Sequence, residues 1–312
     1  MKKRLLSLIL ALCIIISFSP STLAANLPEV DVRTEGLTPA QPQEAPAEKP
    51  RDAGAERRTI YVSNEGTEED DGATAETPTT LARATELANE GKKPVEIVVL
   101  GQVSVDTWTS PTVETTLRGG DENAELLFEY CSASDGAYNI SLADALTIDD
   151  IKFNCNYTDY FFSRYYGTYT IVANGYPLVI ASGVQCSYYT ADTIVDSKTC
   201  STSSCYVIGG GLDEDITGGT HVEIYTSLPL TYVYGGGVNG SVESNVYLHI
   251  ENCGKIQHVR AGGYANKKDA KVNGNITLDF INSVTDNPIY GGGYARSSYS
   301  CLLYTSPSPR DA

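Results

Sequence analysis

One short segment of the chain has helical spacing of its apolar residues. The segment "TPTTLARATELANEGK" places four apolar side chains on one face of a helix. These four residues are Leu81, Ala84, Leu87 and Ala88. Thr77 is the expected N-cap, Pro78 fits the first helical position, and Gly91 is expected to end the helix.

The rest of the pattern predicts short β-strands. Directly after the helix, "VEIVVLGQVSV" predicts a pair of strands. From there to Tyr299, apolar runs of strand length are broken by Gly, Asn, Asp and Ser, as in "AELLFEY", "ALTIDDIKF", "YTIVANG" and "PLVIASGV". The chain is therefore expected to be all-β with one short helix near its start.

A glycine motif repeats along the second half of the chain. It occurs at residues 209–211, 235–237, 261–263 and 291–293, in steps of 26, 26 and 30. A four-residue insertion between Tyr264 and Lys271 accounts for the longer step, because the apolar positions on either side of it align. We expect this insertion to form a loop outside a repeating core. Glycine at the motif predicts a corner with positive φ and a close approach to the neighbouring coils.

The repeat alignment also predicts columns of stacked side chains. One inward column should contain Val207, Val233, Val259 and Ile289, and two others should contain Val222, Leu248 and Leu278 with Ile224, Ile250 and Phe280. Asn252 and Asn282 occupy equivalent positions, which predicts a short asparagine ladder at another corner. A unit of this kind buries its apolar face only by stacking on its neighbours, which favours a parallel β-helix, a solenoid of stacked coils.

The start of the folded region resembles a known superfamily. Over residues 59–105, the stretch "IYVSNEGTEEDDGATAETPTTLARATELANEGKKPVEIVVLGQVSV" is similar to the beginning of pectate-lyase-like right-handed β-helix proteins. That resemblance implies a strand, an acidic glycine turn and an amphipathic helix that caps the solenoid. It implies little about activity, because many functions share this scaffold. Lyases of the superfamily use calcium-binding aspartates and an arginine base, and its hydrolases use clustered aspartates with His-Gly and Arg-Lys motifs. We find neither pattern here.

Both ends of the chain differ from this region. Residues 1–25, with three early cations, an apolar run and "STLAA", predict a signal peptide for Sec export and no membrane insertion after cleavage. Residues 26–58 are rich in Pro, Glu and Ala and are expected to be a disordered linker. The β-helix is assigned to 59–300. Residues 301–312, "CLLYTSPSPRDA", resemble a translated sequencing adapter, so the β-helix is expected to be truncated there.

Charge and cysteine content narrow the possible partners. Loss of the signal peptide takes the formal net charge from −17 to −20, which disfavours nucleic acid as a partner. Six of the eight cysteines lie outside the signal peptide and the tail, and Cys200 and Cys205 are near enough to form a disulfide. The alternative, that most are small buried thiols, stays open. No cysteine or histidine spacing indicates a metal site, and "EEDDG" lacks the spacing of a known calcium loop.

One outward column carries weak catalytic candidates. The register places Glu223, His249 and Asp279 side by side, and a carboxylate–imidazole–carboxylate stack could transfer protons. The alternative, which we favour, is a charge-balanced face exposed to solvent. The Asp149–Asp150 pair could also do acid–base work, although a position at a strand end explains it more simply.

A second outward column carries the ligand-binding candidates. Tyr234, Arg260 and Tyr290 are expected to stack beside Tyr232 and His258. Aromatic rings with an arginine suit the faces of sugars, and they also suit each other through cation–π stacking that stabilises a β-helix face.

Together these features predict a secreted or cell-surface bacterial protein. We expect it to act as an adhesin or glycan-contacting module, without catalysis in the portion present, with an extracellular glycan or cell-surface polymer as partner and no cofactor. The alternative is a polysaccharide lyase or glycoside hydrolase whose catalytic coils are partly missing, for which calcium would be a possible cofactor.

Overall fold

The chain divides into two units, residues 1–53 and 54–312, and the described residues all belong to the second. The computed structural model describes part of the second unit, namely residues 57–128, 138–155, 158–160, 163–165, 169–190, 193–196, 205–226, 228 and 230–295. The predicted signal peptide, nearly all of the predicted linker and the tail 301–312 lie outside these residues. The first strand begins at Arg58, one residue before the predicted start of the β-helix.

Most strands belong to three sheets. Sheet A contains, in spatial order, β1 (Arg58–Thr67), β2 (Val95–Val99), β5 (Thr115–Gly119), β8 (Leu146–Asp149), β13 (Leu178–Ile180), β17 (Thr220–Ile224), β19 (Val246–Glu251) and β22 (Ile276–Ile281). Sheet B contains β3 (Gln102–Val105), β6 (Glu125–Phe128), β9 (Lys152–Cys155), β14 (Gln185–Thr190) and β15 (Thr193–Asp196). Sheet C contains β4 (Trp108–Thr109), β7 (Ile140–Ser141), β12 (Tyr169–Val172), β16 (Cys205–Ile208), β18 (Leu230–Tyr234), β20 (Lys255–Arg260) and β23 (Val284–Thr285).

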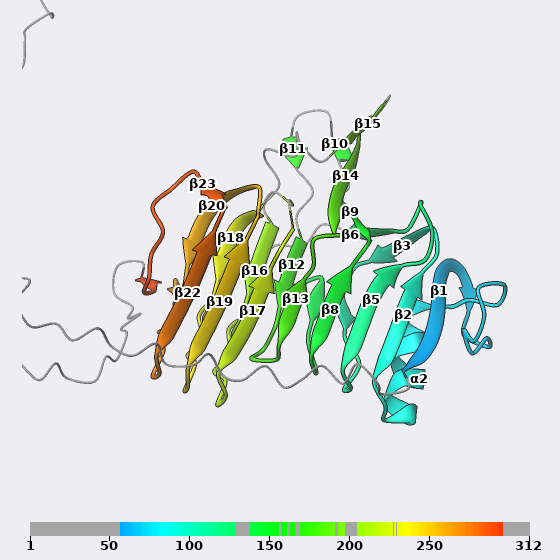
Figure 1. Cartoon of the computed structure of the whole chain (residues 1–312), viewed down its shortest axis with the longest axis horizontal. Helices are drawn as coiled ribbons and strands as arrows, with labels where there is room; N and C mark the ends of the chain where they lie inside the picture. Colours follow the sequence, from blue (N-terminus) through cyan, green and yellow to red (C-terminus); the bar gives the residue numbers. More distant parts are fainter. Residues whose placement is uncertain are drawn as a thin grey trace, which may run out of the picture. The chain divides into compact units, whose positions relative to one another are not determined.

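The chain visits these sheets in a fixed order and so winds into stacked coils. Early coils pass from sheet A to sheet B to sheet C, as in β5, β6 and β7, whereas coils from β17 onward alternate between sheets A and C. Figure 1 shows the strands of sheet A side by side in one row, from blue β1 to orange β22. Every pairing within sheets A and C is parallel. The predicted fold class, an all-β parallel β-helix, is confirmed, and right-handed crossovers are the rule for such connections.

Three small pairings lie outside this pattern. β14 and β15 form an antiparallel pair at the edge of sheet B. The strands β10 (Thr158–Tyr160) and β11 (Ser163–Tyr165) form an antiparallel pair, and β21 (Tyr264–Ala265) and β24 (Tyr294–Ala295) form a parallel one. The pair β21–β24 follows the glycine motif of two successive coils and becomes important below.

The predicted register is confirmed. Val222 pairs with Leu248, and Leu248 pairs with Leu278, so the steps of 26 and 30 residues both hold. The inserted residues form a loop after β21, where the side-chain oxygen Oδ1 of Asn239 accepts the backbone amides of Asn266 and Lys267 at 2.8 Å each. The insertion therefore changes a loop and leaves the stacked strands in register.

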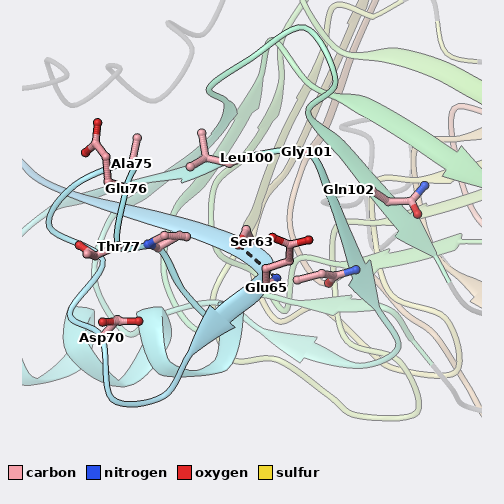
Figure 2. Close-up of a pocket in the computed structure, with 11 residues that line it drawn as sticks. Ser63, Glu65, Asp70, Ala75, Glu76, Thr77, Leu100, Gly101 and Gln102 are labelled. Atoms are coloured by element: carbon pink, nitrogen blue, oxygen red, sulfur yellow. Dashed lines mark hydrogen bonds between the residues drawn. The ribbon is translucent and has the colours of Figure 1, made fainter.

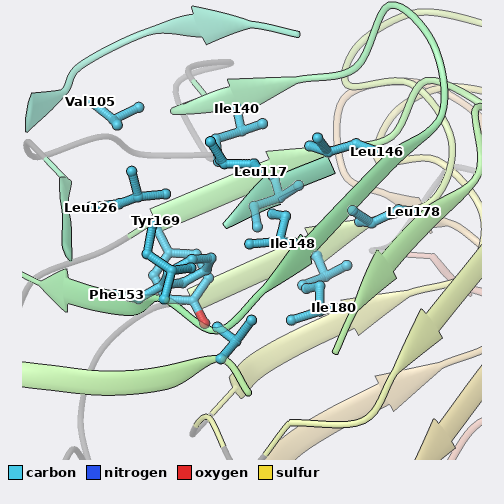
Figure 3. Packing of buried hydrophobic residues seen from close by; sticks show 14 of the residues in the cluster. Val105, Leu117, Leu126, Ile140, Leu146, Ile148, Phe153, Tyr169, Leu178 and Ile180 are labelled. Atoms are coloured by element: carbon cyan, nitrogen blue, oxygen red, sulfur yellow. The ribbon is translucent and has the colours of Figure 1, made fainter. Parts of the chain in front are cut away.

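Apolar side chains fill the interior of the coils. The inward column of Val207, Val233 and Val259 is fully buried, as predicted. Ile289 aligns with this column through the Arg260–Tyr290 bridge, yet it is 37% exposed because it lies in the last described coil. Figure 3 shows how side chains from all three sheets meet in this interior.

The N-terminal helix α2 (Leu81–Gly91) buries the four predicted apolar residues, but both of its ends differ from the prediction. Thr80, not Thr77, is the N-cap, and its side chain accepts the backbone amide of Arg83 at 3.1 Å. The preceding Thr79 is buried and bridges strand β1, which keeps the chain extended there. At the other end, Gly91 is still helical, and Lys92 adopts the left-handed conformation with φ of 52°.

Close packing explains the glycines in the first three copies of the motif, whereas a Cβ at Gly291 or Gly292 would meet no atom within 4 Å. A Cβ at Gly209 would lie 2.2 Å from the carbonyl oxygen of Gly235, and one at Gly235 would lie 2.2 Å from that of Ala261. The predicted positive φ is wrong for these glycines, since none of them has one. Positive φ occurs at other corners, including Asn252 and Asn282, whose amides form the predicted ladder through a hydrogen bond of 3.4 Å.

Cys205 and Cys253 are buried thiols. Cys205 and Cys253 are both free, so Cys205 does not support the predicted local disulfide, and Cys200 lies outside the described residues. Burial raises the pKa of the Cys253 thiol to about 11. No helix in the described part of the chain is long and apolar enough to cross a membrane.

Candidate functional site

Three adjacent strands of sheet A carry a cluster of polar and aromatic side chains on their outer face. Strand alternation turns these side chains outward, while Val222, Leu248 and Leu278 point into the core. We call this cluster the sheet A array, and it consists of His221, Glu223, Tyr225, Tyr247, His249, Glu251 and Asp279. Successive strands of a parallel sheet lie about 4.8 Å apart, so these side chains contact one another between coils.

Glu223 lies at one end of the array and is largely buried. Its Oε1 lies 2.6 Å from Nε2 of His221, and its Oε2 accepts the hydroxyl of Tyr225 at 2.7 Å. Burial, followed by the hydrogen bond to this carboxylate, raises the pKa of Tyr225 above its ordinary value. Tyr225 therefore stays protonated and donates a hydrogen bond to Glu223.

His249 lies at the centre of the array between two carboxylates. Its Nε2 lies 3.2 Å from Oε2 of Glu251, and its Nδ1 lies 3.5 Å from Oδ2 of Asp279. The hydroxyl of Tyr247 also donates to Asp279, at 3.3 Å. The predicted alignment of Glu223, His249 and Asp279 is confirmed, and the imidazole of His249 also contacts Glu251.

Four members of the array were not predicted as site residues. They are His221, Tyr225, Tyr247 and Glu251. The signal for them was present, because "THVEIY" and "VYLHIE" place polar or aromatic residues at every second position of strands whose other positions are apolar. The array has three carboxylates, and those of Glu251 and Asp279 are substantially exposed. Such groups can accept hydrogen bonds from hydroxyls, and an imidazole between carboxylates can also relay protons.

The second predicted site lies on sheet C, and part of it is a stacked ladder of rings. Tyr206 and Tyr232 stack with centroids 4.9 Å apart, and Tyr232 and His258 stack at 4.7 Å. The ring planes are within 16° and 8° of parallel, so the inner ring faces cover one another. Burial, followed by the charge of Arg260, lowers the pKa of His258. The ladder thus offers ring edges, rather than stacked faces, to a ligand.

The prediction that Tyr234 and Arg260 face solvent is wrong. Tyr234 is 2% exposed and Arg260 is 8% exposed. The physical reason is that the chain after each glycine motif folds back over sheet C, where Val238 and Tyr264 pack against Tyr234. Their burial creates a second apolar cluster outside the main core.

Arg260 is enclosed by tyrosine rings. Its guanidinium carbon Cζ lies between 4.4 and 6.0 Å from the centroids of five rings, and Nη1 donates to the hydroxyl of Tyr234 at 3.3 Å. We call these five rings the tyrosine cage, and they belong to Tyr232, Tyr234, Tyr264, Tyr290 and Tyr294. All five predicted residues of this site are thus brought together, but mainly as packing around a buried cation.

A groove of about 580 Å³ lies at the other end of the β-helix, between strand β1 and the acidic loop that follows it (Figure 2). Three carboxylates line it, those of Glu65, Asp70 and Glu76. Within the described residues, no group of three or more His, Cys, Asp or Glu side chains could hold a metal ion.

The Asp149–Asp150 pair lies at a turn. Asp149 is the last residue of β8, and Asp150 has φ of 45°. The side chain of Asp149 accepts the backbone amide of Asp150 at 2.9 Å, so the pair stabilises a strand end, as we favoured.

The comparisons with known proteins add no family assignment. No protein-family model matches the chain, and no curated protein or solved structure is significantly similar to it. The fold itself defines the class, a parallel β-helix protein, and the resemblance to the pectate-lyase-like superfamily stays a prediction.

Proposed function

We propose that this protein is an exported, non-catalytic β-helix module that contacts an extracellular glycan through the sheet A array. The observation that carries the proposal is the alignment of polar side chains across β17, β19 and β22 on an outer face of the solenoid. Solenoids use extended surfaces of this kind for binding, because each coil repeats the same spacing.

The chemistry of the array suits a polyhydroxylated ligand. The carboxylates of Glu251 and Asp279 are exposed and can accept hydrogen bonds from sugar hydroxyls. The contacts of His249 with both carboxylates limit their motion, so less side-chain entropy is lost when a ligand binds. Export to the cell surface is part of the proposal and rests on the signal-peptide pattern of residues 1–25.

The proposal is tested by measuring binding to a panel of extracellular polysaccharides with the wild-type protein and the Glu251→Gln variant. Loss of one hydrogen bond to a charged group should weaken binding about tenfold or more. The matched control is Glu122→Gln, which removes the same charge from an exposed loop away from the array. Absence of binding to every polysaccharide, or equal binding by both variants, would contradict the proposal.

A second candidate is proton-transfer catalysis at His249, which the two flanking carboxylates favour. An assay with pectin and calcium distinguishes it from simple binding. Release of unsaturated or newly reducing products that is lost in His249→Ala would favour catalysis, whereas binding without product formation would favour the first proposal.

A further inference from the structure

Arg260 is a buried cation whose hydrogen-bonding groups are only partly satisfied. The residue is 8% exposed, and its Nη1 donates to Tyr234. Its Nε is buried and has no hydrogen-bond partner. None of the ion pairs found between described residues includes Arg260. A buried guanidinium normally has a carboxylate or comparable acceptor, because removing it from water is costly.

The tyrosine cage compensates for this burial only in part. Ring faces attract the cation through their quadrupole, and the ring of Tyr294 lies closest, at 4.4 Å. A ring face is a poor substitute for the oxygen acceptors that guanidinium N–H groups prefer. With Nη1 bonded to Tyr234, the edge formed by Nε and Nη2 remains for an acceptor. A guanidinium edge of this kind has two parallel N–H groups and binds oxyanions in a bidentate manner.

The rings of the cage that belong to the last described coil are partly exposed. Tyr290 and Tyr294 are 40% and 41% exposed, whereas Tyr234 on the opposite side is 2% exposed. Their rings contact each other edge to face at 6.3 Å, and both lie within cation–π distance of Arg260. A ligand that approaches from this side meets two partly exposed rings first and then the guanidinium. Because Nε is buried, full bidentate pairing requires a small shift of the side chains around it.

We propose that Arg260, Tyr290 and Tyr294 form a binding site for an oxyanion carried on a sugar ring, with the sugar stacked against the exposed tyrosines. The oxyanion supplies the acceptor that the guanidinium lacks, and the sugar ring covers the exposed aromatic surface. The chain is strongly acidic overall, but at physiological salt the charges of carboxylates farther than about 8 Å from the site are largely screened. The attraction between the oxyanion and Arg260 is therefore local. The site lies on sheet C and does not depend on the sheet A array.

The test measures binding of glucose, glucuronate, glucose 6-sulfate and glucose 6-phosphate to the full chain by titration calorimetry. We expect at least one of the three charged sugars to bind about tenfold to a hundredfold more tightly than glucose. The three charged probes distinguish a carboxylate from a sulfate or phosphate ester. Binding of glucose as tight as that of all three charged sugars, or no binding of any charged sugar, would overturn the proposal.

Two variants assign the effect to Arg260. Arg260→Gln should remove the preference for the charged sugar, whereas Arg118→Gln, which removes a half-exposed arginine paired with Glu96, should keep it. If Arg260→Gln does not fold, Arg260→Lys keeps the charge but loses the bidentate edge, and it should bind the charged sugar several-fold less tightly. Unchanged preference in a folded Arg260 variant would overturn the proposal.

Discussion

Replacement of Gly235 by alanine should destabilise the β-helix strongly. The added Cβ would lie 2.2 Å from the carbonyl oxygen of Ala261 in the next coil and 2.8 Å from Cγ1 of Val246. Real contacts of this type are longer than 3 Å, so the two coils must separate by close to 1 Å where strands are normally spaced about 4.8 Å apart. The clash is with backbone, which cannot rotate away as a side chain can.

The expected cost is about 3 kcal/mol, at the upper end of the range for overpacking a buried site. Urea unfolding followed by circular dichroism measures it as a lower midpoint. Gly218→Ala is the matched control, because a Cβ there meets no atom within 4 Å and its φ is not positive. It should change stability by less than about 0.5 kcal/mol. A Gly235→Ala variant as stable as the control would refute the close-packing explanation of the glycine motif.

Three further predictions concern the ends of the helix and one ion pair. Thr80→Ala should cost about 1 kcal/mol in urea unfolding, whereas Thr77→Ala should cost less than about 0.5 kcal/mol, because only Thr80 caps the helix. Lys92→Gly should raise the unfolding midpoint by relieving a left-handed residue that costs about 1 kcal/mol, and a lower midpoint would contradict the observed backbone conformation. The hydrogen bond from Arg118 holds the pKa of the Glu96 carboxyl below its ordinary value. The ionised carboxylate therefore stabilises the fold at any pH above the ordinary pKa of Glu, and this stabilisation is lost as the pH falls through the lower pKa of the folded state. Glu96→Gln should therefore be less stable than wild type at pH 7 and should lose less stability on acidification, as measured by urea unfolding at pH 7 and at an acidic pH. Equal losses of stability in the two proteins on acidification would argue against this linkage.

The register of the β-helix could be predicted because the glycine motif fixes it. At Gly209 and Gly235 a Cβ would clash with the next coil, which explains glycine at these two equivalent positions, whereas the same position of the following coil is Ala261. The column of Val222, Leu248 and Leu278 and the column of Ile224, Ile250 and Phe280 then have a single alignment. The inserted residues must lie at the one place where this alignment breaks. The same close packing explains why positive φ was not needed at these positions, a distinction that residue type alone does not make.

The exposure of the candidate site could be predicted only in part. Alternation along a strand predicts the face of the sheet to which a side chain points, but it does not predict which other segments cover that face. On sheet A, Asp279 is accessible as expected, whereas Glu223 on the same outer face is largely buried. On sheet C the chain folds back after each glycine motif, so Tyr234 and Arg260 are buried although they lie in the predicted outward column. The predicted N-cap was wrong for a related reason. Pairing of Thr79 with β1 keeps the chain extended there, so the helix begins after Thr80 and not after Thr77.

Hydrogen–deuterium exchange with and without a bound polysaccharide tests the proposed contact surface most directly. If the sheet A array contacts the glycan, peptides that cover β17, β19 and β22 should gain protection, while peptides that cover β2 and β5 at the other end of sheet A should not change. Protection confined to other regions, with β17, β19 and β22 unchanged while ligand is bound, would contradict the proposed function.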